Sequence, residues 1–353
     1  MSVKMVKSFL ATLFPITIPI IGVFGAINIY KHYQKNKKAK VRLQHINQYE
    51  NQGYVISDSS QIINRYNSIP INTPYNYTNK EIVRPYMEEL ERKLGPDIRL
   101  ARKNFSTLKV EKSKEIIKTG AVGIYEGSNN IIKYVKNNVE ILGHEMLHMA
   151  SYMYNPVTNT HHHGFMQQKD QTIIGVGLNE GYTELLTSRI FTNGKITSYP
   201  RLVRIVKLLE EFFPNPQLIS HYYFTCNLPE FLQNLRRYCT QEEIKELLYG
   251  LDKLYELNSL PSSPIAIKLE TQLATKLYNI YARSFVAEPA KVEAFRKKAG
   301  ENKLTALALS GKKTNITRTS PFTRIKTSFQ NGFRKIKNFF IGTQPTPQPA
   351  YSR

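Results

Sequence analysis

The chain has 353 residues, 41% of them hydrophobic, and 49 Lys and Arg against 27 Asp and Glu give it a net charge of +22. This length allows one large domain or two small ones, and the hydrophobic content is sufficient for a packed core. A strongly basic chain favours anionic partners. No nucleic-acid-binding signature accompanies the charge, and the basic residues concentrate at the two ends. The composition therefore favours a membrane surface over a specific nucleic acid.

Residues 8–30 contain no charged side chain. Such a run is long enough to cross a bilayer core of about 30 Å, and membrane helices tolerate prolines such as Pro15 and Pro19. Lys and Arg are more frequent in 31–42 than before the run, which predicts a single-pass anchor with the rest of the chain on the cytoplasmic side. The alternative is a signal peptide or signal anchor that exports the chain, which the length of the run and its basic flank disfavour.

The next segment leads into a predicted sheet. Residues 31–75 are rich in Asn, Gln and Lys and are expected to form a tether. The sequence Thr-Asn-Lys-Glu at the start of 78–95 matches a capping box and predicts a helix there. Two or three strands are expected within 98–136. Two of these, 120–127 and 130–135, are rich in β-forming residues and are separated by a Gly-Ser-Asn-Asn turn.

The pattern H-E-x-x-H occurs at His144, Glu145 and His148, in a helix predicted over 138–154. Residues four apart lie on one face of a helix, so the two imidazoles can hold one zinc ion. The carboxylate after the first His is then placed to take a proton from water at the metal. The alternative is two surface His and a Glu on an ordinary helix.

A second motif, Asn-Glu-Gly-Tyr-Thr-Glu at 179–184, opens another predicted helix, 179–192. A catalytic zinc takes three protein ligands and keeps one position open, and the first helix supplies only two. Glu180 is therefore the candidate for the third ligand. Glu184 lies one turn further on the same face, where its carboxylate can accept a hydrogen bond from the free ring N–H of a ligating His.

The two motifs together resemble those of the gluzincins, the thermolysin-like and aminopeptidase-like branch of the zincin metallopeptidases. The resemblance covers roughly residues 120–192, about a fifth of the chain. It implies roles for five residues: zinc ligands His144, His148 and Glu180, general base Glu145, and Glu184 as the hydrogen-bond partner of His144.

The same resemblance implies an α+β, zincin-like fold, in which a small mixed sheet precedes a mainly helical lobe and zinc lies in the cleft between them. Zincins have an edge strand just before the active-site helix, along which the substrate main chain pairs. The strand 130–135 is the candidate, and the alternative is that it is only a core strand. Glu126 is a further candidate, for contact with a substrate amine as in aminopeptidases.

The sequence departs from the gluzincin pattern between the motifs. The segment 155–178 is longer than in thermolysin and is interpreted as an inserted loop of unknown role. It contains the run His161-His162-His163, a rival source of the third ligand. The extension of H-E-x-x-H that marks metzincins is absent, which excludes that pattern.

The second half of the chain is predicted to be helical over 199–213, 228–238, 241–257 and 264–286. A Thr-Gln-Glu-Glu capping box precedes the third of these helices. In gluzincins a Tyr or His from a downstream helix donates a hydrogen bond to the oxyanion. Here His221 and Tyr222 are the candidates, and the alternative is a purely structural aromatic cluster.

Two remaining features concern redox state and the C-terminal end. Cys226 and Cys239 are the only cysteines, and two reduced thiols are a simpler interpretation than a disulfide. Within 322–340, apolar residues recur every three or four positions with Lys and Arg between them, as in a basic amphipathic helix on an anionic membrane. The alternative is an unstructured basic tail. The Pro-rich segment 343–349 is expected to be disordered.

The sequence thus predicts three parts: an anchor with its basic flank at 1–45, a zincin-like metallopeptidase domain at 46–300, and a basic, partly disordered tail at 301–353. The predicted function is that of a membrane-anchored zinc metallopeptidase acting on a peptide or protein substrate. Two alternatives stay open. One is a catalytically silent zincin fold that serves as a membrane-bound binding or regulatory protein. The other is a basic lipid- or nucleic-acid-binding protein with a coincidental metal motif.

Overall fold

The computed structural model describes residues 57–95, 98–170, 172–258 and 263–300. Within these residues the chain is α+β, with eleven α-helices, one short 3-10 helix and two small β-sheets. None of the helices described is both long and apolar enough to span a membrane. The membrane span expected at 8–30 and the amphipathic helix expected at 322–340 lie outside the described residues.

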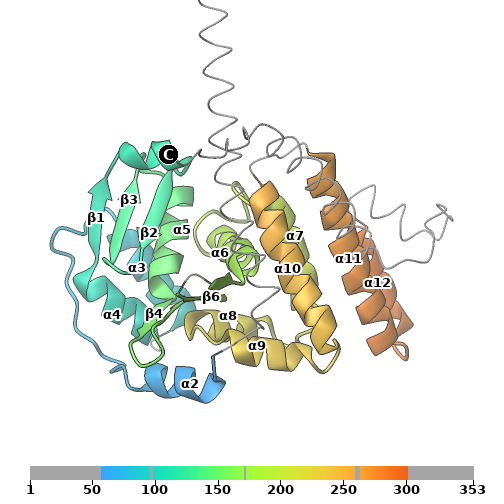
Figure 1. Cartoon of the computed structure of the whole chain (residues 1–353). Coiled ribbons are helices and arrows are strands. Elements are labelled where there is room, and N and C mark those ends of the chain that lie inside the picture. Colours follow the sequence, from blue (N-terminus) through green and yellow to red (C-terminus); the bar gives the residue numbers. More distant parts are fainter. Residues whose placement is uncertain (1–56, 96–97, 171, 259–262, 301–353) are drawn as a thin grey trace, which may run out of the picture.

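A three-stranded sheet packs against α5 (Val139–Ala150), as Figure 1 shows. Its strands are β1 (Lys109–Lys112), β2 (Gly123–Glu126) and β3 (Ile131–Tyr134), in the order β1-β3-β2. β3 pairs parallel with β1 and antiparallel with β2. The prediction that 130–135 is the edge strand is therefore wrong. The turn at 127–130 folds β3 back beside β2, so β3 is central and β2 is the edge strand next to α5.

Two helices pack in the same part of the fold, α3 (Arg84–Leu94) and α4 (Arg99–Thr107). The capping box predicted at Thr78 does not open α3. The helix begins later, with Pro85 in its first turn, where the fixed φ of proline suits a helix. α4 occupies residues that were expected to contain a strand, because its buried side chains recur at helical spacing rather than alternating: Leu100, Ala101, Asn104 and Phe105.

A second sheet follows α5 directly and is absent from the predicted fold. α5 ends at Ala150, earlier than predicted, and a four-stranded antiparallel meander begins after Ser151. Its strands are β4 (Tyr152–Asn155), β5 (Thr160–His163), β6 (Met166–Lys169) and β7 (Thr172–Ile174). The segment predicted as an inserted loop is thus mostly sheet. Burial alternates along β5, as it does in a strand with one face against the core.

Helices make up the rest of the described fold: α6 (Val176–Ile190), α7 (Pro200–Glu210), α8 (Pro216–Phe224), α9 (Leu228–Leu235), α10 (Gln241–Leu257), α11 (Pro264–Ser284) and α12 (Pro289–Ala299). The four downstream helices predicted from the sequence correspond to α7, α9, α10 and α11, and the predicted capping box at Thr240 is present. α8 and α12 were not predicted, and neither was α2 (Ser59–Asn67), which lies inside the expected tether.

Cys226 and Cys239 are buried free thiols, as expected.

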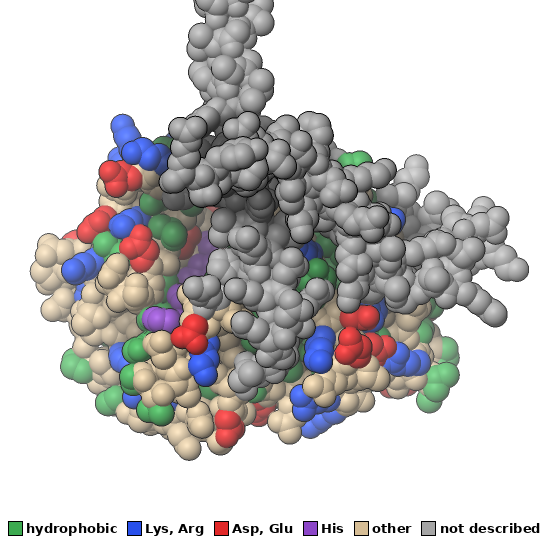
Figure 2. All heavy atoms as spheres, in the orientation of Figure 1, with side chains coloured by type: hydrophobic (Ala, Val, Ile, Leu, Met, Phe, Trp, Pro, Cys, Tyr) green, Lys and Arg blue, Asp and Glu red, His purple; other side chains and the backbone are tan. Residues whose placement is uncertain are grey.

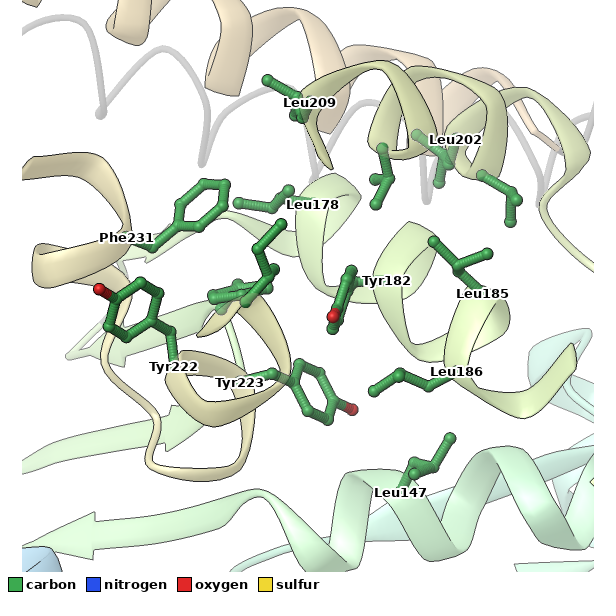
Figure 3. Close-up of a cluster of buried hydrophobic side chains, with 14 of the residues drawn as sticks. Leu147, Leu178, Tyr182, Leu185, Leu186, Leu202, Leu209, Tyr222, Tyr223 and Phe231 are labelled. Atoms are coloured by element: carbon green, nitrogen blue, oxygen red, sulfur yellow. The ribbon is translucent and has the colours of Figure 1, made fainter. Parts of the chain in front are cut away.

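α6 lies at the centre of the fold, against α5, α7 and α10. Gly177 allows the contact with α10, because a Cβ at this position would lie 2.1 Å from the backbone oxygen of Leu251. Figure 3 shows the opposite side of α6, where Tyr182 lies near Tyr223 of α8 and above Leu147 of α5. Close packing on several sides fixes the position of α6 relative to α5.

The N-terminus of α6 is capped by a side chain from α10. Its N-cap residue, Gly175, has a φ of 75° and no side chain with which to cap the helix. The carboxylate of Asp252 accepts hydrogen bonds from the backbone N–H groups of Gly175, at 3.1 Å, and Gly177, at 2.7 Å. Burial raises the pKa of Asp252 to about 7, although both N–H donors act in the opposite direction. Asp252 therefore satisfies two buried helix-end donors that would otherwise lack partners.

We expect Asp252→Ala to lower the free energy of unfolding by about 2 to 4 kcal/mol, because two buried N–H donors lose their acceptors. Asp252→Asn keeps one acceptor oxygen and should cost less. Urea unfolding followed by circular dichroism measures both changes. Equal stability of the wild-type and Ala variants would show that the cap contributes nothing.

Candidate metal centre

α5 brings the H-E-x-x-H residues into the interior. Asn138 caps the helix by accepting a hydrogen bond from the N–H of Glu140. Leu142 and Met146 are fully buried and anchor one side of the helix in the core. His144 and His148 are also buried, at 8% and 9% exposure, on the side that meets α6. Burying two imidazoles costs free energy unless their nitrogens have hydrogen-bond partners or bind a metal. The groups around the two rings therefore determine whether they can act as metal ligands.

Three potential metal donors converge between α5 and α6. The Nε2 atoms of His144 and His148 lie 3.1 Å apart. The Oε2 of Glu180 is 3.3 Å from His144 Nε2, and its Oε1 is 3.4 Å from His148 Nε2. Around a tetrahedral zinc with bonds of about 2.0 to 2.1 Å, ligand atoms lie about 3.3 to 3.4 Å apart. Each imidazole faces a different oxygen of Glu180, and with one atom from each residue the three donors lie within 4.8 Å of one another. The group could therefore hold one small cation, and it is the one such His, Cys, Asp and Glu group in the described residues.

The charges of the cluster also favour a bound cation. Three carboxylates, those of Glu145, Glu180 and Glu184, surround the two imidazoles, and none of them forms an ion pair with a Lys or Arg in the described part of the chain. Glu145 and Glu184 are 7% and 1% exposed. Three largely buried carboxylates that face only two imidazoles carry more negative charge than those rings can compensate, so this arrangement favours a bound cation.

The pKa shifts reflect this excess of negative charge. Burial lowers the pKa of His144, but the nearby carboxylates of Glu180 and Glu184 outweigh burial and raise that pKa to about 10. Burial likewise raises the pKa of Glu180, but the imidazoles of His148 and His144 hold it well below its ordinary value. The cluster therefore favours positive charge on His144, next to the position where a metal ion would bind.

Glu184 lies behind His144, as predicted. Its Oε2 is 3.3 Å from the Nδ1 of His144. That nitrogen is buried. The distance to Glu184 is within hydrogen-bond range, but the angle is too poor for a hydrogen bond. The other oxygen of Glu184 accepts hydrogen bonds from the backbone N–H groups of Thr197, at 2.6 Å, and Ser198, at 3.0 Å. Asn179, the first residue of the second motif, places its amide 3.5 Å from His148 Nδ1, so both imidazoles have a neighbour behind the ring.

Glu145 is held against the edge strand of the first sheet. A Cβ on Gly123 would lie 3.0 Å from Glu145 Oε1, so the absence of a side chain there leaves room for the carboxylate. The backbone N–H of Tyr125 donates a hydrogen bond to Glu145. Burial raises the pKa of Glu145, while His144 and His148 oppose that shift. A carboxylate with a raised pKa beside a cation site is suited to accept and return a proton.

Tyr199, which sequence reasoning missed, lies beside the centre. It directly precedes α7, and its ring centroid is 5.9 Å from that of His144. Its phenol lies close enough to Glu180 for that carboxylate to influence its pKa. Burial and the nearby carboxylates of Glu180 and Glu145 raise the pKa of Tyr199 well above its ordinary value, so the phenol stays protonated. No motif marks Tyr199, and only its position after a predicted loop, close to the N-E-x-x-T-E helix, distinguishes it from the other tyrosines.

The earlier candidates His221 and Tyr222 lie in α8 and are not brought to the centre. His221 is exposed, and the Tyr222 hydroxyl accepts a hydrogen bond from Asn234 of α9 at 2.8 Å. Tyr222 points away from α6 in Figure 3, whereas its neighbour Tyr223 points towards it. The Tyr223 hydroxyl is 2.7 Å from Thr183 Oγ1. The helical spacing of α8 thus turns Tyr223, rather than its neighbours, towards α6.

The three consecutive histidines of β5 do not join the donor group. His161 Nδ1 is 2.9 Å from the Tyr152 hydroxyl, and His162 is fully buried with neither ring nitrogen hydrogen-bonded. Burial lowers the pKa of His163 to about 3, and the charges of His148 and Glu180 also influence this pKa. Figure 2 shows some His side chains reaching the surface on the side of the sheets.

Glu126 is engaged elsewhere. Its carboxylate forms an ion pair with Lys133 on the neighbouring strand at 2.8 Å. This pairing disfavours the role in binding a substrate amine that was considered for Glu126, because such a role needs a carboxylate available to the ligand.

No family model, no curated protein and no solved structure matches the chain. The likeness to gluzincins therefore rests on the two motifs.

We expect the protein to bind about one equivalent of a divalent transition metal such as Zn²⁺. At a free metal concentration of about 100 times the dissociation constant, binding should add about 2.7 kcal/mol to the free energy of unfolding. Glu180→Ala should weaken binding because it removes one of three donors, whereas His161→Ala should not. Competition with a chromogenic chelator measures the affinities. Unchanged affinity in Glu180→Ala would exclude this carboxylate as a ligand.

Proposed function

We propose that the protein is a zinc-dependent metallopeptidase, anchored to the membrane through residues 8–30. The observation that carries the proposal is the convergence of His144, His148 and Glu180 at spacings of 3.1 to 3.4 Å, with the buried carboxylate of Glu145 beside them. Two imidazoles and one carboxylate form a donor set typical of catalytic zinc, which keeps a further position open. The membrane part of the proposal rests on the sequence of 8–30 alone.

His144, His148 and Glu180 would hold the zinc. When bound, zinc supplies Lewis acidity, which makes water a nucleophile near neutral pH and polarises the carbonyl that is attacked. Glu184 and Asn179 lie behind the two imidazoles and orient their rings.

Glu145 would act as the general base and then as the general acid. Its burial raises its pKa, and its contact with the Tyr125 N–H fixes the carboxylate near the metal donors. It would take a proton from the attacking water and deliver that proton to the nitrogen of the leaving amine.

Tyr199 would stabilise the negative charge that develops on the carbonyl oxygen. Its phenol stays protonated and lies next to Glu180, so it can donate a hydrogen bond into the site. It takes over the role first considered for His221 and Tyr222.

The edge strand β2 would hold the substrate main chain. Among the strands that the structure describes, β2 pairs with β3 alone, and its other edge runs past Glu145 near Gly123 and Tyr125. An extended peptide that adds to this edge would pass the metal centre with its scissile bond near Glu145. A peptide or protein is therefore the proposed substrate.

We expect Glu145→Gln to lower kcat by roughly 100-fold or more, because the amide cannot accept and return the proton. Zinc affinity should stay close to that of the wild-type protein, since Glu145 is not among the three ligands. Cleavage of a fluorogenic peptide library, with metal content measured in parallel, tests this. Wild-type activity in Glu145→Gln would remove the general-base role, and a wild-type protein that binds zinc but cleaves no peptide would favour the catalytically silent alternative.

We expect Tyr199→Phe to lower kcat by about 100- to 1,000-fold with little change in KM, the effect of losing one oxyanion donor. The matched control is Tyr222→Phe, which should retain wild-type kcat because its hydroxyl contacts Asn234 outside the centre. The reverse result, loss of kcat in Tyr222→Phe alone, would return the role to α8.

A further inference from the structure

The loop between α6 and α7, residues 191–199, is fixed by contacts with three other helices. Lys195 pairs with Glu140 of α5, and Asn258, which follows α10, donates a hydrogen bond to the carbonyl of Ser198 at 3.1 Å. The third contact is with α6, through the carboxylate of Glu184. The last residue of this loop is Tyr199.

Glu184 contacts both the loop and a metal donor. Its Oε1 accepts hydrogen bonds from the N–H groups of Thr197 and Ser198 at 2.6 and 3.0 Å, and the Thr197 hydroxyl is 3.3 Å away. Its Oε2 lies 3.3 Å from the Nδ1 of His144. The carboxylate is 1% exposed, so water does not compete for these contacts. One rigid group therefore joins His144 to the two residues that precede Tyr199.

We propose that Glu184 is a positioning residue that couples metal binding at His144 to the order of residues 197–199, and hence to the placement of Tyr199. The inference rests on the proposed metal centre, but it does not require that the substrate be a peptide.

The coupling has a specific physical origin. A metal on Nε2 of His144 displaces the proton held there, leaves the proton on Nδ1, and fixes the ring with its Nδ1–H directed towards Glu184. Nδ1 is buried and lies 3.3 Å from Oε2 without a well-aligned hydrogen bond, so a ring held in a better orientation strengthens this contact. A better contact on Oε2 fixes the carboxylate, and with it the acceptor for Thr197 and Ser198. By linkage, an ordered loop must strengthen metal binding by the same factor.

The structure distinguishes this coupling from an ordinary loop anchor. The contact of Asn258 with Ser198 involves no metal donor, so it should order the loop equally with and without metal. Of the two groups that accept from or donate to residues 197 and 198, Glu184 is the one that also faces a metal donor, so the order of these two residues should depend on the metal through Glu184. Substitution by Gln tests this difference. A Gln can present its carbonyl oxygen to the loop N–H groups or to His144 Nδ1, but its NH₂ group then faces a donor on the other side.

The experiment is hydrogen exchange measured by mass spectrometry on the full-length protein in detergent, with and without Zn²⁺. In the wild-type protein we expect zinc to slow exchange at Thr197 and Ser198 by roughly tenfold, which corresponds to a coupling of about 1.4 kcal/mol. In Glu184→Gln this zinc-dependent slowing should disappear, and zinc affinity should fall by about 10- to 100-fold.

Two further variants serve as controls. Asn258→Ala should speed exchange of the loop in the absence of zinc while the slowing by zinc remains. Asn215→Ala removes a helix cap in the loop between α7 and α8 and should change neither exchange at 197–198 nor zinc affinity.

Wild-type exchange at 197–198 that does not respond to bound zinc would overturn the coupling, as would zinc-dependent slowing that persists in Glu184→Gln. A protein that binds no zinc would overturn both this inference and the metal centre. A protein that shows the coupling but cleaves no peptide would retain the inference and refute only the proposed peptidase activity.

Discussion

The arrangement of the whole site follows from one electrostatic constraint. Glu145, Glu180 and Glu184 lie around His144 and His148, largely excluded from water and without Lys or Arg partners in the described part of the chain. Buried negative charge of this kind is stable only with a compensating cation. A proton on His144 provides part of that compensation, and a divalent metal at the convergence of the three donors would provide more.

The surrounding fold keeps these groups in place. The donors come from two helices, so their spacing depends on how closely α5 and α6 pack and on how α6 is oriented. Gly177 lets α6 approach α10, and Asp252 completes the hydrogen bonds at the start of α6. Neither residue touches the metal donors. Both act on the centre only through the position of the helix that carries Glu180.

The catalytic roles proposed here divide between regular elements and a loop. Glu145 and the metal donors lie on helices, and Glu145 is also held by the edge strand β2 through Gly123 and Tyr125. Tyr199 instead ends a loop, and a loop has many conformations unless contacts restrict it. Glu184 supplies such contacts from the same carboxylate that faces His144.

The sequence by itself determined which residues share a helix face. A period of 3.6 residues places His144 with His148, and Glu180 with Glu184, whatever the rest of the chain does. Its hydrophobic periodicity and capping signals also sufficed for α7, α9, α10 and α11. Only the tertiary structure decided that Glu180 meets both imidazoles, that β2 rather than β3 is the edge strand next to α5, and that most of 155–178 belongs to a sheet. It alone placed Tyr199, rather than His221 or Tyr222, beside the centre. These features depend on contacts between segments distant in the chain, and local periodicity carries no information about which segments meet.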